Sequence, residues 1–211
     1  MRDSIVIIGP HPDDVFISCA GLVLKHLDDY DFKVVCMTSQ GHLGSGADSS
    51  TRLKEEKEAW SMISPNIEVL FFDEGIDTQL FKQEHQIIEY IESTIKNFNP
   101  SYVFTPYFSD THQDHRTVSH ATMSACRYNK NILFYETPST LSFDSNCYVE
   151  IPRNILNNKK DLIRIYKSQT MGDKYTTGLE DYVYASALKN GTKSRVCEFA
   201  EAFMSHKLFI F

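Results

Sequence analysis

The chain has 211 residues, of which 42% are hydrophobic and 23% are charged, and its formal net charge at pH 7 is -7. This hydrophobic share excludes wholesale disorder, and the length fits one domain spanning residues 1–211. The negative charge argues against a broad phosphate-binding surface, so we expect no nucleic-acid partner.

The cysteines and the apolar runs narrow the class of protein further. The five cysteines are widely separated and form no CxxC pair, which favours buried thiols over a disulfide framework or a thiolate zinc site. No run approaches the ~20 apolar residues that a membrane-spanning helix needs, and the first residues show no leader pattern. We therefore expect no membrane span and a cytoplasmic protein.

Short β-branched runs alternate with longer segments of helical period through the first two thirds of the chain. The runs that predict strands cover residues 5–8, 32–37, 67–72, 102–105 and 132–135. The segments that predict helices cover residues 15–27, 51–63, 81–98 and 115–128. Repeats of this kind build parallel sheets, and strands that are apolar throughout are buried on both sides. The predicted fold class is α/β, with a mostly parallel central sheet and helices on both faces.

The strand–helix rhythm weakens after about residue 146. Residues 153–168 and 179–189 predict further helices, and residues 208–211 form a hydrophobic tail. We expect residues 147–211 to complete the core and to shape a substrate pocket. The tail would be awkward if exposed, so it is either a late strand or an interface element, and the second interpretation favours a homo-oligomer.

Three polar loops follow the first, second and fourth predicted strands. They cover residues 9–14, 39–50 and 106–115, and the first and last are rich in histidine and aspartate. Ligands of open parallel sheets bind in the crevice beyond the carboxyl ends of the strands. The three loops are therefore expected to meet at one edge of the sheet and to form the functional site there.

The residue types in the first and last loops are those of a catalytic metal site. His11 and Asp14 lie three residues apart at a strand-to-helix turn, and His115 could supply a second imidazole. Two imidazoles and one carboxylate leave a fourth position open, which is the donor set of a catalytic zinc ion. Zinc lowers the pKa of bound water to ~7, and Asp13 is available to take the proton. His112 is available to stabilise an oxyanion or to protonate a leaving amine.

Each of these clusters also has a simpler explanation. Residues 10–14 could be a turn followed by a helix N-cap, and His112 and His115 could be surface histidines. The joint occurrence of both clusters after parallel strands favours the metal site. Asp110 and Asp114 are near enough in sequence to orient the imidazoles by hydrogen bonds.

Two motifs resemble those of the LmbE-like, PIG-L-type zinc-dependent N-acetylglucosaminyl deacetylases. PHPDD at residues 10–14 resembles the family motif after the first strand, and HQDH at 112–115 resembles its HxDH motif. Weaker similarities extend along the chain: RLKE at 52–55 with Ala59, LFFD at 70–73, FYET at 134–137, YKSQ at 166–169 and FAEAF at 199–203, the last two as a C-terminal helix and tail.

The resemblance implies a Rossmann-like three-layer fold and one Zn²⁺ per chain. It implies His11, Asp14 and His115 as zinc ligands, Asp13 as the general base and His112 as acid or oxyanion stabiliser. It also implies that Arg52 contacts substrate; the alternative is a salt bridge of Arg52 within its own helix, to Glu55 or Glu56.

The sequence departs from the family pattern at two positions. Gln113 stands where a proline is common, which should alter the turn more than the chemistry. His42 stands where many members have a glutamate. It could therefore reach the pocket, but we expect a solvent-exposed loop histidine.

The resulting hypothesis is hydrolytic removal of an acetyl group from a small-molecule N-acetyl amino-sugar conjugate, which releases acetate and a free amine. Two alternatives stay open at this point. One is a zinc amidohydrolase that acts on a non-sugar amide. The other is a non-catalytic Rossmann-like nucleotide-binding module, against which the first loop lacks the GxGxxG pattern.

Overall fold

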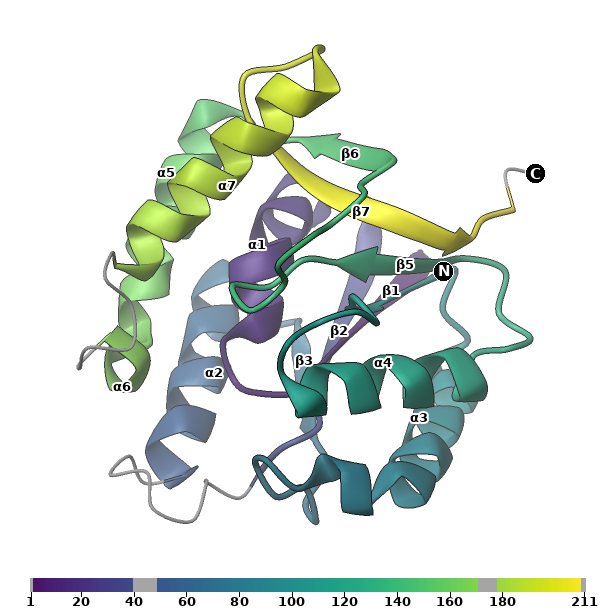
Figure 1. Ribbon diagram of the computed structural model, residues 1–211. Coiled ribbons are helices and arrows are strands. Elements are labelled where there is room, and N and C mark those ends of the chain that lie inside the picture. Colours follow the sequence, from purple (N-terminus) through teal and green to yellow (C-terminus); the bar gives the residue numbers. More distant parts are fainter. Residues whose placement is uncertain (1, 40–48, 171–177, 210–211) are drawn as a thin grey trace.

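A seven-stranded sheet of order β3-β2-β1-β4-β5-β7-β6 forms the middle of the protein (Figure 1). The computed structural model describes residues 2–39, 49–170 and 178–209. The strands are β1 Asp3–Gly9, β2 Tyr30–Cys36, β3 Glu68–Phe71, β4 Tyr102–Pro106, β5 Ile132–Tyr135, β6 Cys147–Glu150 and β7 Ala200–Lys207. Strands β1 to β5 pair in parallel, whereas β7 is antiparallel to both β5 and β6. The prediction of an α/β fold with a mostly parallel sheet is confirmed.

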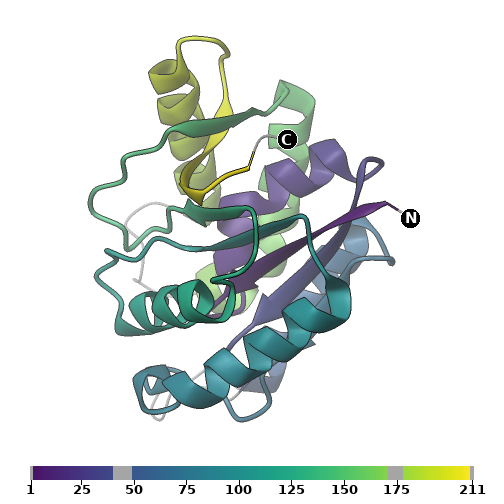
Figure 2. The ribbon, with the colours of Figure 1, turned by 90° about the vertical axis from the view of Figure 1, so that its right-hand side faces the viewer.

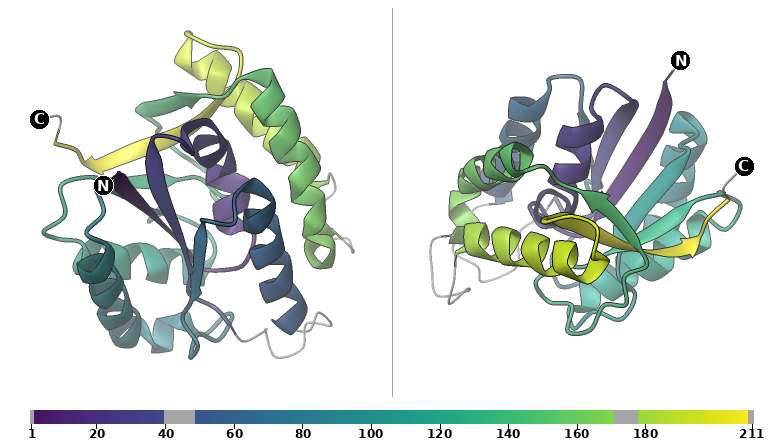
Figure 3. Two further views of the ribbon diagram at one scale, coloured as in Figure 1. Left: turned by 180° about the vertical axis from the view of Figure 1, so that it is seen from behind. Right: turned by 90° about the horizontal axis from the view of Figure 1, so that it is seen from above.

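Helices cover both faces of this sheet (Figures 2 and 3). The helices are α1 Asp14–His26, α2 Ser49–Ile63, α3 Glu84–Phe98, α4 Gln113–Ala125, α5 Arg153–Leu162, α6 Lys167–Thr170 and α7 Leu179–Ser194, with short 3-10 turns η1 Leu80–Lys82 and η2 Ile163–Ile165. Helices α3 and α4 pack on one face with Val6 and Ile8 of β1, whereas α1, α2, α5 and α7 pack on the other with Ile5 and Ile7. Successive side chains of β1 thus enter opposite cores, which explains its continuous apolar run.

The structure differs from the predicted elements mainly in three places. The segment predicted as a helix over 153–168 is divided into α5, η2 and α6. The segment predicted as one helix over 81–98 is divided at Gln83, whose side chain accepts a hydrogen bond from the Ile76 N–H and donates one to the Glu74 carbonyl. Strands β6 and β7 were not predicted, and residues 199–203, which resemble the family's C-terminal tail, lie mostly in β7. Their antiparallel pairing joins residues that are far apart in sequence, which local periodicity does not show.

Strand β1 lies between β2 and β4, so the chain leaves β1 toward one side of the sheet and later returns on the other. Such a change of direction opens a crevice at the carboxyl ends of the two central strands. Both histidine–aspartate motifs follow these strands, one after β1 and one after β4. Among the helices that the structure describes, none has the length and apolar character to cross a membrane.

Candidate active site

The loops after β1 and β4 meet at the carboxyl edge of the sheet. The two strands pair directly, with Ile5, Val6 and Ile7 opposite 102–104. The predicted shared edge is therefore present for residues 9–14 and 106–115. Most of the third predicted loop, including His42, lies outside the described residues.

Asp14 lies between the two histidines that are proposed as metal ligands. Asp14 Oδ2 lies 3.1 Å from His11 Nδ1 and 3.3 Å from His115 Nε2. Tetrahedral zinc with nitrogen and oxygen ligands at 2.0–2.1 Å requires ligand atoms about 3.3 Å apart. All three residues are buried. The donor types and spacing therefore fit a divalent cation with an open fourth position.

The Nε2 atom of His11, on the far side of the ring from Asp14, lies beside two carboxylates. His11 Nε2 lies 3.2 Å from Asp114 Oδ2 and 3.2 Å from Asp77 Oδ1. The Asp114 carboxylate also accepts backbone N–H groups of Thr78 and Leu80 at 2.6 and 3.3 Å. Such partners fix the tautomer and the ring orientation of a metal-binding imidazole.

Possible ligand atoms of His11, His112 and His115 lie within 4.8 Å of one another, and so do those of a second group, His11, Asp77, His112 and Asp114. In this structure the two carboxylates of that group are already engaged: Asp114 accepts backbone N–H groups, and Asp77 forms an ion pair with Arg52. We therefore interpret this group as the support of His11 rather than as a second metal site.

Asp110 has the corresponding place beside His115. Asp110 Oδ2 lies 3.3 Å from His115 Nδ1, which is also 3.1 Å from the Thr137 hydroxyl. The Asp110 carboxylate accepts hydrogen bonds from the hydroxyls of Thr137, Ser139 and Thr140 at 2.6–2.8 Å. Asp110 was expected to orient an imidazole by a hydrogen bond. No sequence motif marks Ser139 or Thr140, and Thr137 was noted only as the last residue of FYET.

Asp13 occupies the N-cap position of α1, yet its side chain makes no capping hydrogen bond. Its backbone has φ 100°, a conformation that costs a non-glycine residue about 1–3 kcal/mol. Burial and the adjacent charge of Asp14 raise the pKa of Asp13 to about 7. Asp13 therefore occupies the position of a helix cap, as the simpler explanation of PHPDD expects. Its side chain does not act as a cap and lines a cavity instead.

Glu56 of α2 binds the backbone of Asp13 and was not predicted as a site residue. Its carboxylate accepts hydrogen bonds from the Asp13 N–H at 2.9 Å, from Trp60 Nε1 at 2.8 Å and from the Tyr166 hydroxyl at 2.7 Å. The side chain is buried, and burial raises its pKa. The sequence gives no signal for it, because Glu56 lies in the charged run KEEKE at residues 54–58.

Arg52 reaches the site from α2. Its guanidinium donates to Asp77 Oδ2 at 3.1 Å and to the Pro12 carbonyl at 3.3 Å. The alternative in which Arg52 pairs with Glu55 or Glu56 is therefore not what the structure has. Asp77 was not predicted, because it lies in an irregular segment after β3 that carries no motif.

A cavity of about 260 Å³ opens over these groups. It is lined by His11, Asp13, Asp14, Arg52, Asp77, His112, His115, Pro138, Ser139 and Gln169. His112 Nδ1 accepts the Asp114 N–H at 3.2 Å, which leaves Nε2 to carry the proton of the neutral ring. Burial and the charges of His11 and His115 lower the pKa of His112. The arrangement offers a carboxylate of raised pKa and an imidazole donor on one cavity wall.

A family model described as PIG-L: GlcNAc-PI de-N-acetylase matches residues 6–126, which contain both motifs. The chain belongs to this family. This PIG-L family member is also 31% identical over 176 residues to the uncharacterized deacetylase YaiS of Escherichia coli K12, a match that covers 79% of this chain and 92% of YaiS. It is thus a deacetylase, a hydrolase of amide bonds, and the nucleotide-binding alternative is removed.

Solved structures share the fold of this PIG-L family chain. N,N'-diacetylchitobiose deacetylase from Pyrococcus horikoshii matches with TM-score 0.79 and 21% identity, over 96% of this chain and 83% of that one. The conserved protein TT1542 from Thermus thermophilus matches with TM-score 0.80 and 20% identity, over 100% and 97%. GalB, a 4-carboxy-2-hydroxymuconate hydratase, matches with TM-score 0.80 at 15% identity, over 100% and 98%. The fold alone therefore does not fix the reaction.

Proposed function

We propose that the protein is a zinc-dependent deacetylase that hydrolyses the acetamide of a small N-acetyl amino-sugar conjugate to acetate and a free amine. The observation that carries the proposal is the placement of Asp14 Oδ2 between His11 Nδ1 and His115 Nε2. The Asp13 side chain, which makes no capping hydrogen bond, lines the same cavity. One zinc ion per chain would be held by these three ligands. When bound, the ion supplies Lewis acidity, which polarises a carbonyl and lowers the pKa of water.

Asp13 is the proposed general base. Its raised pKa lies close to neutral pH, where a base combines a sufficient deprotonated fraction with a useful proton affinity. The Asp13 carboxylate takes a proton from the attacking water and can return it to the leaving nitrogen. The Glu56 hydrogen bond to the Asp13 N–H holds the turn that aims this carboxylate at the cavity.

His112 is the proposed stabiliser of the developing oxyanion. Its lowered pKa favours the neutral imidazole, and its Nδ1 is occupied by the Asp114 N–H. The Nε2–H is then free to donate to the oxygen that gains negative charge as water attacks the amide carbon.

The sugar substrate is proposed from the walls of the cavity and from the relatives. Arg52, Asp77, Ser139 and Gln169 present donors and acceptors suited to hydroxyl groups, and Arg52 Nε is buried without a hydrogen-bond partner among the described residues. The family description and the chitobiose deacetylase both name N-acetylglucosamine-type substrates.

Free cysteines at the described positions support a proposed cytoplasmic location, and exposed Leu208 supports a proposed homo-oligomer.

A substrate panel separates this function from a non-sugar amidohydrolase. Zinc-loaded protein is incubated with N-acetylglucosamine, N,N'-diacetylchitobiose, aryl and inositol glycosides of N-acetylglucosamine, and N-acetylated amino acids. Release of primary amine is measured, with metal-free protein as the control. We expect metal-dependent amine release from the sugars. Release from the amino acids alone would contradict the sugar assignment and favour the amidohydrolase.

A further inference from the structure

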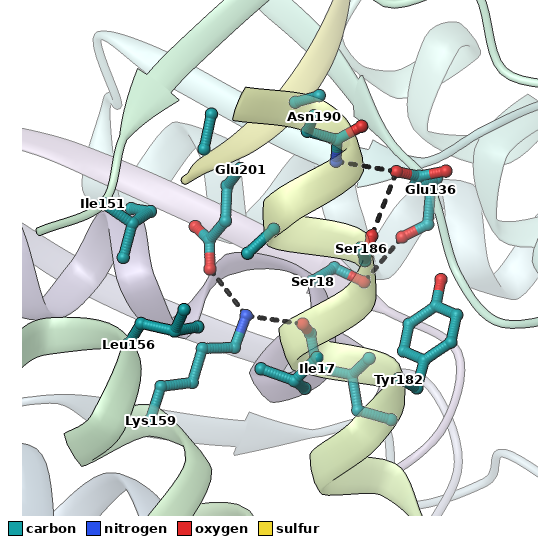
Figure 4. A pocket seen from close by; sticks show the side chains of 14 residues that line it. Ile17, Ser18, Glu136, Ile151, Leu156, Lys159, Tyr182, Ser186, Asn190 and Glu201 are labelled. Atoms are coloured by element: carbon teal, nitrogen blue, oxygen red, sulfur yellow. Dashed lines mark hydrogen bonds and ion pairs between the residues drawn. The ribbon is translucent and has the colours of Figure 1, made fainter. Parts of the chain in front are cut away.

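A buried ion pair between Lys159 of α5 and Glu201 of β7 contacts helix α1 (Figure 4). Lys159 Nζ lies 2.6 Å from Glu201 Oε1, and the two residues are only 3% and 6% exposed. The cavity beside them, of about 20 Å³, can hold a water molecule and is too small for a substrate. Removing two charges from water is unfavourable unless each is fully hydrogen-bonded, so the bonds that the pair makes indicate its role.

The Glu201 carboxylate binds the backbone of α1. It accepts the Gly21 N–H through Oε1 and the Leu22 N–H through Oε2, both at 2.7 Å. A Cβ atom at Gly21 would lie 2.6 Å from Oε1 and 2.9 Å from Ile151 Cδ1. Glycine is unfavourable inside a helix, but here any larger residue would make the Glu201 carboxylate or the Ile151 side chain shift.

The Lys159 ammonium binds the same helix one turn earlier. It donates to the Ile17 carbonyl at 2.6 Å (Figure 4). In a regular α-helix the Ile17 carbonyl accepts from the Gly21 N–H. The Lys159 ammonium therefore binds the carbonyl, and the Glu201 carboxylate binds the N–H, of one i to i+4 pair in the helix. Together these contacts fix the position of α1 along its axis and its rotation about that axis.

Helix α1 connects this ion pair to the reacting groups. The Ile17 N–H donates to the Asp13 carbonyl at 2.8 Å, so a single residue separates Lys159 from the strained Asp13 turn. Asp14, the proposed ligand, is the first residue of α1. Ser18 donates to the Glu136 carbonyl at 2.8 Å, next to the Thr137 hydroxyl that contacts His115.

We propose that Lys159 and Glu201 are positioning residues that hold α1 so that Asp13 and Asp14 keep their catalytic places; this inference rests on the proposed function. Both residues lie outside the segment 6–126 that the family model matches. The C-terminal part of the chain would then do more than complete the core, because it sets the geometry of a site whose ligands come from the first 115 residues.

The test compares Glu201→Gln, Lys159→Met and Gly21→Ala with wild type as zinc-loaded enzyme. Zinc dissociation constants are measured by chelator competition, and kcat, KM and the pH profile are measured on the best panel substrate. Because displaced supports of metal ligands weaken metal binding about 10–100-fold, we expect a zinc Kd raised about tenfold or more and a lower kcat with little change in KM. The acid limb of the pH profile should also move.

Gly21→Ala is the sharpest of these variants. Alanine is the better helix former, so local propensity alone predicts a more stable protein with unchanged zinc binding. Displacement of the Glu201 carboxylate instead predicts weaker zinc binding. If Glu201→Gln does not fold, Lys159→Met and Gly21→Ala still test the positioning role, since both keep the Glu201 carboxylate.

Ile91→Ala serves as the control for a general loss of stability. Ile91 is buried on α3, in the core on the opposite face of the sheet from α1. Its variant should lose stability and keep the zinc Kd and kcat of wild type when compared below the melting range. Wild-type Kd and kcat in folded Lys159→Met and Gly21→Ala, or an equal loss in Ile91→Ala, would overturn the proposal. A wild-type protein inactive on every panel substrate would defeat the proposed function, while the zinc Kd values would still test the positioning role.

Discussion

Asp13 and Asp14 are neighbours in the chain, and the structure gives their carboxylates opposite electrostatic environments. Burial and the charge of Asp14 raise the pKa of Asp13 to about 7. Burial would raise the pKa of Asp14 as well, but the charge of His115 and hydrogen bonds from His11 and His115 lower it far below the usual range. Divergent pKa values in one site are how two like groups take different roles, here proposed as base and ligand.

The histidine ligands predict proton release when zinc binds. Burial opposes their charged forms, but carboxylate partners raise the pKa of His11 well above 6.5 and that of His115 to about 9. Both rings are therefore protonated at pH 7 in the metal-free protein and must be neutral as ligands, so about two protons should leave per zinc. The number should fall as pH rises through about 9.

Calorimetric titration with zinc in buffers of different ionisation enthalpy measures this proton count. The apparent binding enthalpy at pH 7 should change linearly with the buffer's ionisation enthalpy. An enthalpy that is the same in all buffers at pH 7 would show that zinc does not displace protons from these imidazoles.

At the scale of elements, the sequence predicted the segments that repeat a local pattern. The strand at 132–135 has the predicted bounds, and α1 differs by one residue at each end. The segment between β3 and η1 was not predicted, because it has no period. Its position depends on tertiary contacts, such as Gly75, where a Cβ would lie 1.8 Å from the Met37 carbonyl oxygen.

This irregular segment places Asp77 beside His11 and Arg52. The variant Asp77→Asn tests whether that contact supports zinc binding. The amide keeps the shape but removes the negative charge that both cations face. We expect zinc affinity to fall about tenfold, as for other partners of metal-binding histidines, with the fold retained. Chelator competition measures the Kd.

Glu74→Gln is the matched control, because it removes a carboxylate that is exposed in the same segment. Its zinc affinity should equal that of wild type. Equal affinities for Asp77→Asn and wild type would mean that Asp77 does not support His11.

At the scale of the whole molecule, the candidate site was predictable because parallel strands end at one edge. That rule brought His11 and His115 together although they lie far apart in sequence, and the structure places both beside Asp14. The supporting groups could not be found in this way. Glu56 and Asp77 act through contacts made by tertiary packing, and no spacing in the sequence marks them. Glu201 lies in FAEAF at 199–203, but its contact with α1 also depends on packing.

Zinc that binds only the native protein should stabilise the whole fold. Zinc at 100 times its Kd adds about 2.7 kcal/mol by mass action, which raises Tm by several degrees. His11→Ala should lose this increase because it removes a proposed ligand. A thermal melt with and without zinc measures the effect, and an undiminished rise of Tm in His11→Ala would contradict its role as a ligand.

Amine release by zinc-loaded wild type and zinc-loaded Asp13→Asn, measured side by side on N,N'-diacetylchitobiose and simple N-acetylglucosamine glycosides, tests the assignment most directly. Both proteins should hold one zinc per chain, and loss of the general base should lower kcat about 100-fold or more. Turnover by Asp13→Asn equal to wild type, with zinc bound in both, would contradict Asp13 as the base of a metal-dependent deacetylase.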